Sequence, residues 1–292
     1  MTSVAQWVSG ARPRTLSAAV VPVAIGACVA SRSVDVDVTF ASRTVAALLV
    51  SLALQIAVNF ANDYSDGIRG TDATRSGPMR LVGSGVASAA AVKNAAFLSF
   101  GVAAVAGLFL ASQTTWWLIA VGLASIVAAW TYTGGPRPYG YAGLGEVFVF
   151  VFFGLLATAG SFYVTTEDVS LLAVVSGAVS GFLSVALLVV NNIRDIENDR
   201  LSGKMTLAVR LGNSRSRTLY LGCYVAAGAM ILLAAREVPL ALLGLVGLLA
   251  ALPAVSTVRA ASSPRDLVSA LGMTSRVQLV VGLLYSTGIL LG

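Results

Sequence analysis

Two segments of the sequence, at residues 59–72 and 191–199, gather acidic and amide side chains. Each contributes three of the 13 Asp and Glu residues in the chain: Asp63, Asp66 and Asp72 in the first, and Asp195, Glu197 and Asp199 in the second. Successive members of two sets are three or four residues apart: Asn59, Asp63 and Asp66, and Asn191, Asp195 and Asp199. If both segments are helical, each set projects from one face of its helix.

Clustered carboxylates repel one another and are costly to desolvate near a bilayer, so we expect a cation to bind them. Ligand sets made only of oxygen favour a hard cation, and Mg²⁺ is the usual one where phosphates complete its coordination. Two such faces meeting across a helical bundle would hold one diphosphate through bridging Mg²⁺. This would stabilise the leaving group as an allylic C–O bond ionises. The predicted metal ligands and catalytic residues are Asp63, Asp66, Asp195 and Asp199, with Asn59, Asn62, Asp72, Asn191 and Asn192 as further substrate contacts.

Basic residues accompany both acidic segments. They are Arg69, Arg80, Arg137, Arg194 and Lys204. Such side chains donate charge-assisted hydrogen bonds to a diphosphate, so Lys204 and Arg137 are predicted to be catalytic and the others to bind substrate. Cytoplasmic loops of membrane proteins are also rich in Lys and Arg without any substrate, and for each residue we weigh the two interpretations evenly. The glycine-rich segment 77–85 lacks the spacing of a P-loop but could cap the site.

Aromatic residues follow the fourth apolar stretch, between residues 132 and 141. Tyr132 and Tyr139 are predicted to contact substrate, because a π-face can stabilise an allylic cation and a phenol can bind an aromatic acceptor. Tyr141 is interpreted as an ordinary interfacial tyrosine. Glu146 is an isolated carboxylate at membrane depth, which makes it a candidate to pair with Arg137 or to serve the acceptor.

The composition shows what must position these residues. Of the 292 residues, 57% are hydrophobic and 11% charged, and the mean hydropathy is +0.85. A soluble domain carries about a quarter of its residues as charges, so most of this surface must face lipid. Nine stretches are long and apolar enough to cross a bilayer as helices. They are 15–31, 44–61, 91–111, 115–133, 145–165, 170–192, 217–235, 238–258 and 273–291.

The distribution of Lys and Arg predicts the orientation. Alternating crossings put 16 of the 19 basic residues on one side and only Arg32, Arg43 and Arg236 on the other. Basic loops stay in the cytoplasm, so we predict a cytoplasmic N-terminus, a C-terminus outside and both acidic segments on the cytoplasmic side of the plasma membrane. The fold class is therefore all-α, with residues 1–292 forming a single membrane-embedded domain of nine helices. An alternative, a cleaved signal peptide over the first stretch, is disfavoured because it would discard the polar N-terminus.

Several functional classes are excluded by composition. The chain has no histidine, which removes imidazole metal sites and His-based acid–base catalysis. Its two cysteines, Cys28 and Cys223, lie alone in apolar stretches and fit neither a disulfide framework nor a zinc site. The net charge of +6 is scattered between apolar stretches, which argues for membrane orientation rather than nucleic-acid binding.

These motifs together resemble the UbiA superfamily of intramembrane aromatic prenyltransferases. The superfamily pattern Asn-Asp-x-x-Asp and Asp-x-x-x-Asp is found at 62–66 and 195–199. Further motifs resemble the branch that prenylates 1,4-dihydroxy-2-naphthoate in menaquinone synthesis: Arg-Pro-Arg-Thr-Leu at 12–16, Gly-Gly-Pro at 134–136, Gly-Leu-Gly-Glu at 143–146 and Gly-Lys-x-Thr-Leu at 203–207. In the superfamily's commonest first motif a third Asp follows the second by four residues. Here that position is Gly70, and Asp72 is the expected substitute.

The resemblance implies a nine-helix bundle whose cavity opens to lipid, with Mg²⁺ as cofactor. It also implies transfer of a polyprenyl group from polyprenyl diphosphate to the naphthoate ring, with loss of diphosphate and CO₂. The acceptor carboxylate would need a cation, and Arg137 or Arg14 is expected to supply it.

Other functions remain open at this stage. One is transfer to another aromatic acceptor, such as 4-hydroxybenzoate. A second is an ion-coupled transporter, although transporters place their acids near the membrane midplane rather than at helix ends. A third, a phosphatidyl-alcohol transferase, would require an Asp-Gly-x-x-Ala-Arg cluster that the sequence lacks.

Overall fold

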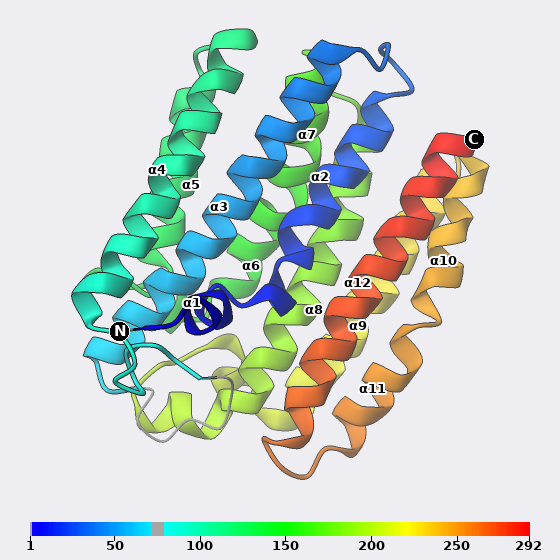
Figure 1. Ribbon diagram of the computed structural model, residues 1–292. Helices are drawn as coiled ribbons and strands as arrows, with labels where there is room; N and C mark the ends of the chain where they lie inside the picture. Colours follow the sequence, from blue (N-terminus) through cyan, green and yellow to red (C-terminus); the bar gives the residue numbers. More distant parts are fainter. Residues whose placement is uncertain (1, 72–78) are drawn as a thin grey trace.

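The computed structural model describes residues 2–71 and 79–292, and these residues form helices, turns and loops without a β-strand (Figure 1). The five longest helices are α3 (Val38–Ile68), α4 (Ala89–Gln113), α8 (Leu171–Leu201), α9 (Leu207–Ala234) and α12 (Asp266–Leu291). The others are α1 (Val4–Gly10), α2 (Ser17–Ala30), α5 (Leu118–Thr131), α6 (Gly145–Phe150), α7 (Ala157–Thr166), α10 (Leu243–Leu248) and α11 (Ala251–Ala260). A π-helical turn, η3 (Val151–Leu156), joins α6 to α7, and 3₁₀ turns form η1 (Pro13–Thr15), η2 (Tyr139–Ala142) and η4 (Pro239–Leu242). Asp72 lies outside the described residues.

The prediction of a helical chain with many apolar helices is confirmed. Within the described ranges, seven helical spans are long and apolar enough to cross a membrane, and the bent pair Val4–Thr15 and Ser17–Ala30 would make eight. The fourth predicted stretch contains only a 14-residue helix, α5, which is short for a full crossing. The count of nine crossings and their orientation therefore stay predictions.

Helix α8 forms the centre of the bundle. Of its most apolar 18-residue window, 83% is buried, compared with 33% for the corresponding window of α4. Gly154 of η3 lets that segment approach α8 closely, because a Cβ added there would lie 2.3 Å from the Cα of Gly181. On α4, large apolar side chains such as Leu98 and Val105 are exposed, as expected for a helix that faces lipid.

The acidic segments occupy the ends of two helices that are longer than a bilayer requires. Helices α3 and α8 each have 31 residues. At 1.5 Å per residue this is about 46 Å, whereas the hydrocarbon core is about 30 Å thick. In Figure 1 both helices end on the same side of the molecule as the N-terminus, opposite the C-terminus. The last turns of α3 and α8 therefore project together, and their unpaired carbonyls add negative potential beside the carboxylates.

Candidate active site

A small polar cavity of about 30 Å³ lies between the ends of α3 and α8. Asp66 and Asn62 enter it from α3, and Asp195 and Asp199 enter it from α8. The remaining lining residues are Arg12, Thr71, Arg80, Tyr132, Asn191, Asn192, Asn198 and Lys204. The structure thus brings the two predicted acidic segments together around one space.

Basic side chains neutralise the carboxylates of this cavity. The Nζ atom of Lys204 lies 3.6 Å from Asp66 Oδ2 and 3.9 Å from Asp199 Oδ1, so one cation bridges the two helices. Arg80 Nη2 lies 3.5 Å from Asp66 Oδ2. Arg194 makes a bidentate pair with Asp195, with N···O distances of 2.8 and 2.7 Å. Burying both charges of such an ion pair costs nearly as much free energy as their attraction gains, so the pairs add little net stability. Asp66, Asp195 and Asp199 can therefore exchange these basic partners for others when a polyanion and its cations enter the cavity.

Two residues of the first acidic segment point elsewhere. Asp63 accepts backbone N–H groups of Leu81 and Val82 at 2.8 and 3.0 Å, and it lines neither of the two cavities described here. Asn59 donates to Ala11 O at 2.8 Å and holds the N-terminal segment on α3. The second acidic segment behaves as its spacing predicts, since Asn191, Asp195 and Asp199 all face the polar cavity.

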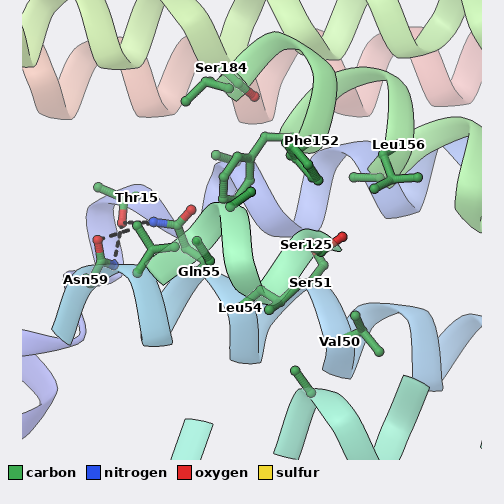
Figure 2. Close-up of a pocket in the computed structure, with 18 of the residues that line it drawn as sticks. Thr15, Val50, Ser51, Leu54, Gln55, Asn59, Ser125, Phe152, Leu156 and Ser184 are labelled. Atoms are coloured by element: carbon green, nitrogen blue, oxygen red, sulfur yellow. Dashed lines mark hydrogen bonds between the residues drawn. The ribbon is translucent and has the colours of Figure 1, made fainter. Parts of the chain in front are cut away.

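A second cavity, of about 1040 Å³, extends among α2 to α8, η1 and the start of α12 and is mostly apolar (Figure 2). Val50 and Leu54 of α3 and Phe152 and Leu156 of η3 line it. Figure 2 shows Thr15, Gln55 and Asn59 joined by hydrogen bonds at one end, with Gln55 Nε2 3.2 Å from Thr15 Oγ1. Such a space suits a long hydrocarbon chain whose polar end lies beside these side chains.

The two cavities share four lining residues: Arg12, Asn62, Tyr132 and Asn191. Next to this junction, Tyr139 stacks on Phe148 with ring centroids 3.8 Å apart, and Tyr132 lies 5.5 Å from Tyr139. All three rings line the apolar cavity. The predicted aromatic contacts therefore lie where a charged head group in one cavity would meet an apolar tail in the other.

Other predicted site residues are placed away from the polar cavity. Arg137 is exposed and lines neither cavity. Arg69 donates to the carbonyls of Thr133 and Gly135 and lies 5.1 Å from the Tyr141 ring, so it fastens the 132–141 loop to α3. Arg14 is exposed but does line the apolar cavity. The catalytic role assigned to Arg137 and the substrate contact assigned to Arg69 stay predictions that the geometry does not support.

Glu146 is buried and pairs with an amide, whereas Arg137, one of the two partners considered for it, is exposed. Asn192 donates to Glu146 Oε1 at 3.0 Å. The other carboxylate oxygen, Oε2, has no hydrogen-bond partner among the described residues. Asn192 itself lines the polar cavity, so Glu146 fixes the orientation of a lining side chain without lining the cavity itself.

Several residues in or beside the two cavities were not predicted as site residues. Arg12, Thr71 and Asn198 belong to the predicted motifs, but nothing in their spacing distinguishes them from their neighbours. Arg265 enters the apolar cavity from the turn before α12, about 200 residues from the acidic segment of α3, and no local pattern marks it. Tyr141 was assigned to the membrane interface, yet its hydroxyl donates to Asp66 Oδ1 at 2.9 Å.

Two phenols of the 132–141 loop, Tyr139 and Tyr141, stay protonated near neutral pH. Burial raises the pKa of Tyr139, and burial together with the Asp66 charge raises the pKa of Tyr141. A raised phenol pKa keeps the proton on the group at neutral and moderately basic pH. Tyr141 therefore holds Asp66 as a neutral donor, and neither tyrosine is a base near neutral pH.

We expect Tyr141→Phe to lower activity by about tenfold, the effect of losing one hydrogen bond to a charged group. Because Tyr141 stays protonated in the wild type, the loss should be equal at every pH between about 6 and 9. A pH–rate profile of both proteins checks this. A basic limb that disappears in the variant would mean that Tyr141 titrates in this range.

The donor set of the polar cavity fits a hard cation. Asn62, Asp66, Asp195 and Asp199 offer oxygen only, which is the ligand type that Mg²⁺ prefers. Among the described residues, no three acidic side chains surround a single point closely enough to hold an ion alone. Mg²⁺ normally takes one or two carboxylates and completes its shell with phosphates and water, so the cavity fits Mg²⁺ that arrives with a phosphorylated ligand.

Sequence comparison identifies the family. The model of the UbiA prenyltransferase family matches residues 19–275. The chain belongs to the UbiA prenyltransferase family. A protein from Mycobacterium tuberculosis named 1,4-dihydroxy-2-naphthoate octaprenyltransferase is 46% identical over 280 residues, covering 96% of this chain and 95% of that protein. A protein of the same name from Haemophilus influenzae is 34% identical and covers 98% and 96%.

Solved structures share the UbiA fold at low sequence identity. The apo structure of a UbiA homolog from Aeropyrum pernix K1 has a TM-score of 0.68 at 16% identity, covering 95% of this chain and 97% of that one. A UbiA homolog from Archaeoglobus fulgidus, solved with DMAPP and Mg²⁺, has a TM-score of 0.64 at 14% identity and covers 97% and 98%. At these identities the likeness concerns the fold of this UbiA family member and not its substrates.

Proposed function

We propose that this UbiA family protein transfers a polyprenyl group from polyprenyl diphosphate to 1,4-dihydroxy-2-naphthoate. The relatives that match nearly its whole length carry that activity in their names. The observation that carries the proposal is the junction of the two cavities at Arg12, Asn62, Tyr132 and Asn191. A polar space lined by carboxylates and cations meets an apolar space of about 1040 Å³, as an amphiphilic diphosphate requires.

The residues of the polar cavity would bind and stabilise the leaving group. Mg²⁺ held by Asp66, Asp195, Asp199 and Asn62 would neutralise the diphosphate as the allylic carbon–oxygen bond ionises. Arg80 and Lys204 lie against the same carboxylates and would donate hydrogen bonds to the departing oxygens. Of the four predicted ligands, Asp63 is turned away from this set.

The reaction also accounts for the lack of a general base. The carbon–oxygen bond breaks with its electrons going to diphosphate, a ring carbon bonds to the prenyl carbon, and the carboxylate leaves as CO₂. Summed over these steps, no proton is released. A site without histidine, with tyrosines that stay protonated, is therefore sufficient for this acceptor.

Two arginines are the candidates to recognise the acceptor carboxylate. Arg14 and Arg265 both line the apolar cavity, and neither forms an ion pair with a described carboxylate. By contrast, Arg194 lines the same cavity but is neutralised by Asp195. We assign the acceptor carboxylate to Arg14 and Arg265, and its ring to the side of the cavity formed by Tyr132 and Tyr139.

Arg265→Gln is expected to raise the KM for dihydroxynaphthoate by about 10- to 100-fold, the effect of losing a hydrogen bond between charged groups. The kcat should change little, because this contact is made equally before and during reaction. Steady-state kinetics at saturating prenyl diphosphate measures both. Arg259→Gln is the control, because Arg259 is an exposed residue in the last turn of α11 and lines neither cavity. Equal effects of the two variants would refute the assignment.

The charge asymmetry of the loops further supports a multi-pass protein of the plasma membrane whose site faces the cytoplasm.

An acceptor panel tests the proposed function itself. Purified protein in lipid vesicles is given octaprenyl diphosphate, Mg²⁺ and either dihydroxynaphthoate or 4-hydroxybenzoate. We expect a prenylated product with dihydroxynaphthoate only. Equal or faster turnover of 4-hydroxybenzoate would instead support another aromatic acceptor, and no product with either would leave the transporter alternative favoured.

A further inference from the structure

Asp63 of the first acidic segment is more deeply buried than Asp66, and its surroundings indicate a role that its motif does not. It is 1% exposed, and its two oxygens accept the backbone N–H groups of Leu81 and Val82. Each oxygen is thus engaged by a separate amide, at 2.8 and 3.0 Å. A carboxylate engaged in this way fixes a backbone turn, because charge-assisted hydrogen bonds to adjacent amides define its position and direction.

Segment 79–86, which carries those amides, is docked on α3 by side-chain packing as well. Leu81 is fully buried and packs against Gly10 of α1 and Phe60 of α3. Val82 lies over Gly67, one helical turn after Asp63, where an added Cβ would be 2.5 Å from Val82 Cγ1. Gly67 therefore permits an approach that any other residue would prevent.

The docked segment delivers Arg80 to the polar cavity. Arg80 directly precedes Leu81, lines the cavity and lies 3.5 Å from Asp66. The segment closes on itself just beyond, since Ala87 donates its N–H to Leu81 O at 2.9 Å. Displacing the Leu81–Val82 turn would therefore displace the guanidinium from the leaving-group position.

We propose that Asp63 is a positioning residue that fixes segment 79–86, and so places Arg80 against the bound diphosphate, and that it does not bind the metal. The part played by Arg80 rests on the proposed function, whereas the anchoring of the segment does not. Within the motif at 62–66, Asn62 and Asp66 then serve the ligand, four residues apart on one face, and Asp63 serves the protein.

The test compares Asp63→Asn with Asp66→Asn in the full-length protein in detergent. Hydrogen exchange at the amides of Leu81 and Val82 is followed without metal, and Mn²⁺ affinity in the presence of inorganic pyrophosphate is followed by electron paramagnetic resonance. Asp63→Asn is expected to speed exchange at both amides by about tenfold or more, because each loses a charged acceptor. Its Mn²⁺ dissociation constant should stay within about twofold of wild type, because Asp63 does not line the polar cavity and both its oxygens are occupied by backbone amides. Asp66→Asn should show the opposite pattern.

A second variant keeps every charge in place. Gly67→Ala improves helix propensity but forces Val82 away, so it should also speed exchange at these amides and lower turnover while Mn²⁺ affinity is kept. Gly101→Ala, where an added Cβ meets nothing, is the matched control. The proposal is overturned if Asp63→Asn weakens Mn²⁺ binding as strongly as Asp66→Asn while exchange at Leu81 and Val82 is unchanged. Neither hydrogen exchange nor Mn²⁺ affinity requires turnover, so a protein that uses a different acceptor would still give a clear result in both measurements.

Discussion

Asp199→Asn is expected to lower prenyl transfer by about 10³-fold, because it removes one of the groups that stabilise the leaving diphosphate. Asp199 faces the polar cavity from α8 and shares Lys204 with Asp66 of α3. Losing its charge would weaken metal binding and release Lys204 from its position between the helices. The rate of diphosphate release at saturating Mg²⁺ and saturating prenyl diphosphate measures the loss.

Glu197→Gln provides the matched control for this prediction. It removes the same charge from the same turn of α8, but Glu197 is exposed and lines neither cavity. Its activity should stay within about twofold of wild type, as for a surface charge. Comparable losses in both variants would show that net charge at this end of the molecule, rather than the cavity, governs the rate.

Gly122→Phe is expected to shorten the prenyl chain that the protein accepts. Gly122 lines the apolar cavity, as do Leu118 and Ile126 one turn before and after it, and an added Cβ meets nothing there. It lies ten residues before Tyr132, which is about 15 Å along the helix. A phenyl ring at this position would obstruct a long tail but leave room for a short one. We expect kcat/KM for octaprenyl diphosphate to fall by about 10²-fold or more, with geranyl diphosphate little affected.

Gly222→Phe on α9 separates this effect from a general disturbance of the bundle. An added Cβ at Gly222 also meets nothing, but Gly222 lines neither cavity. The ratio of octaprenyl to geranyl activity is the decisive quantity, because it cancels losses of folded protein. An unchanged ratio in Gly122→Phe would mean that the tail does not occupy this part of the cavity.

The acidic segments show how far helical periodicity predicts a site. On α8 the spacing of four predicted one shared face for Asn191, Asp195 and Asp199, and the structure confirms it. On α3 the same rule selected Asn59, Asp63 and Asp66, but Asn62 and Asp66 form the cavity face. Residues three and four positions apart on a helix differ in direction by about 60° and 40°. Spacing therefore does not decide whether Asp63 or Asn62 shares a face with Asp66, and the turn formed by segment 79–86, which engages Asp63, decides it. Sequence distance alone gives no information about that contact.

Residues on loops were the hardest to predict. Arg137 and Arg265 are both exposed arginines beside apolar stretches, and only the packing of α12 beside η1 brings Arg265 to the cavity. Arg69, predicted to bind substrate, fastens a loop, and Tyr141, interpreted as an interfacial tyrosine, donates a hydrogen bond to Asp66. The all-helical class followed directly from hydropathy. Hydropathy did not predict the shortness of α5 or the bend between α1 and α2, because where a helix ends or bends depends on tertiary packing.

The most direct measurement of the central claim follows the carboxyl carbon of the acceptor. Purified protein in lipid vesicles receives octaprenyl diphosphate, Mg²⁺ and dihydroxynaphthoate labelled in its carboxyl group, and released CO₂ and diphosphate are counted together. The proposed reaction predicts equal amounts of both, with the release of both lowered by about 10³-fold in Asp199→Asn. Diphosphate released without labelled CO₂, or transfer that persists undiminished in Asp199→Asn, would contradict it.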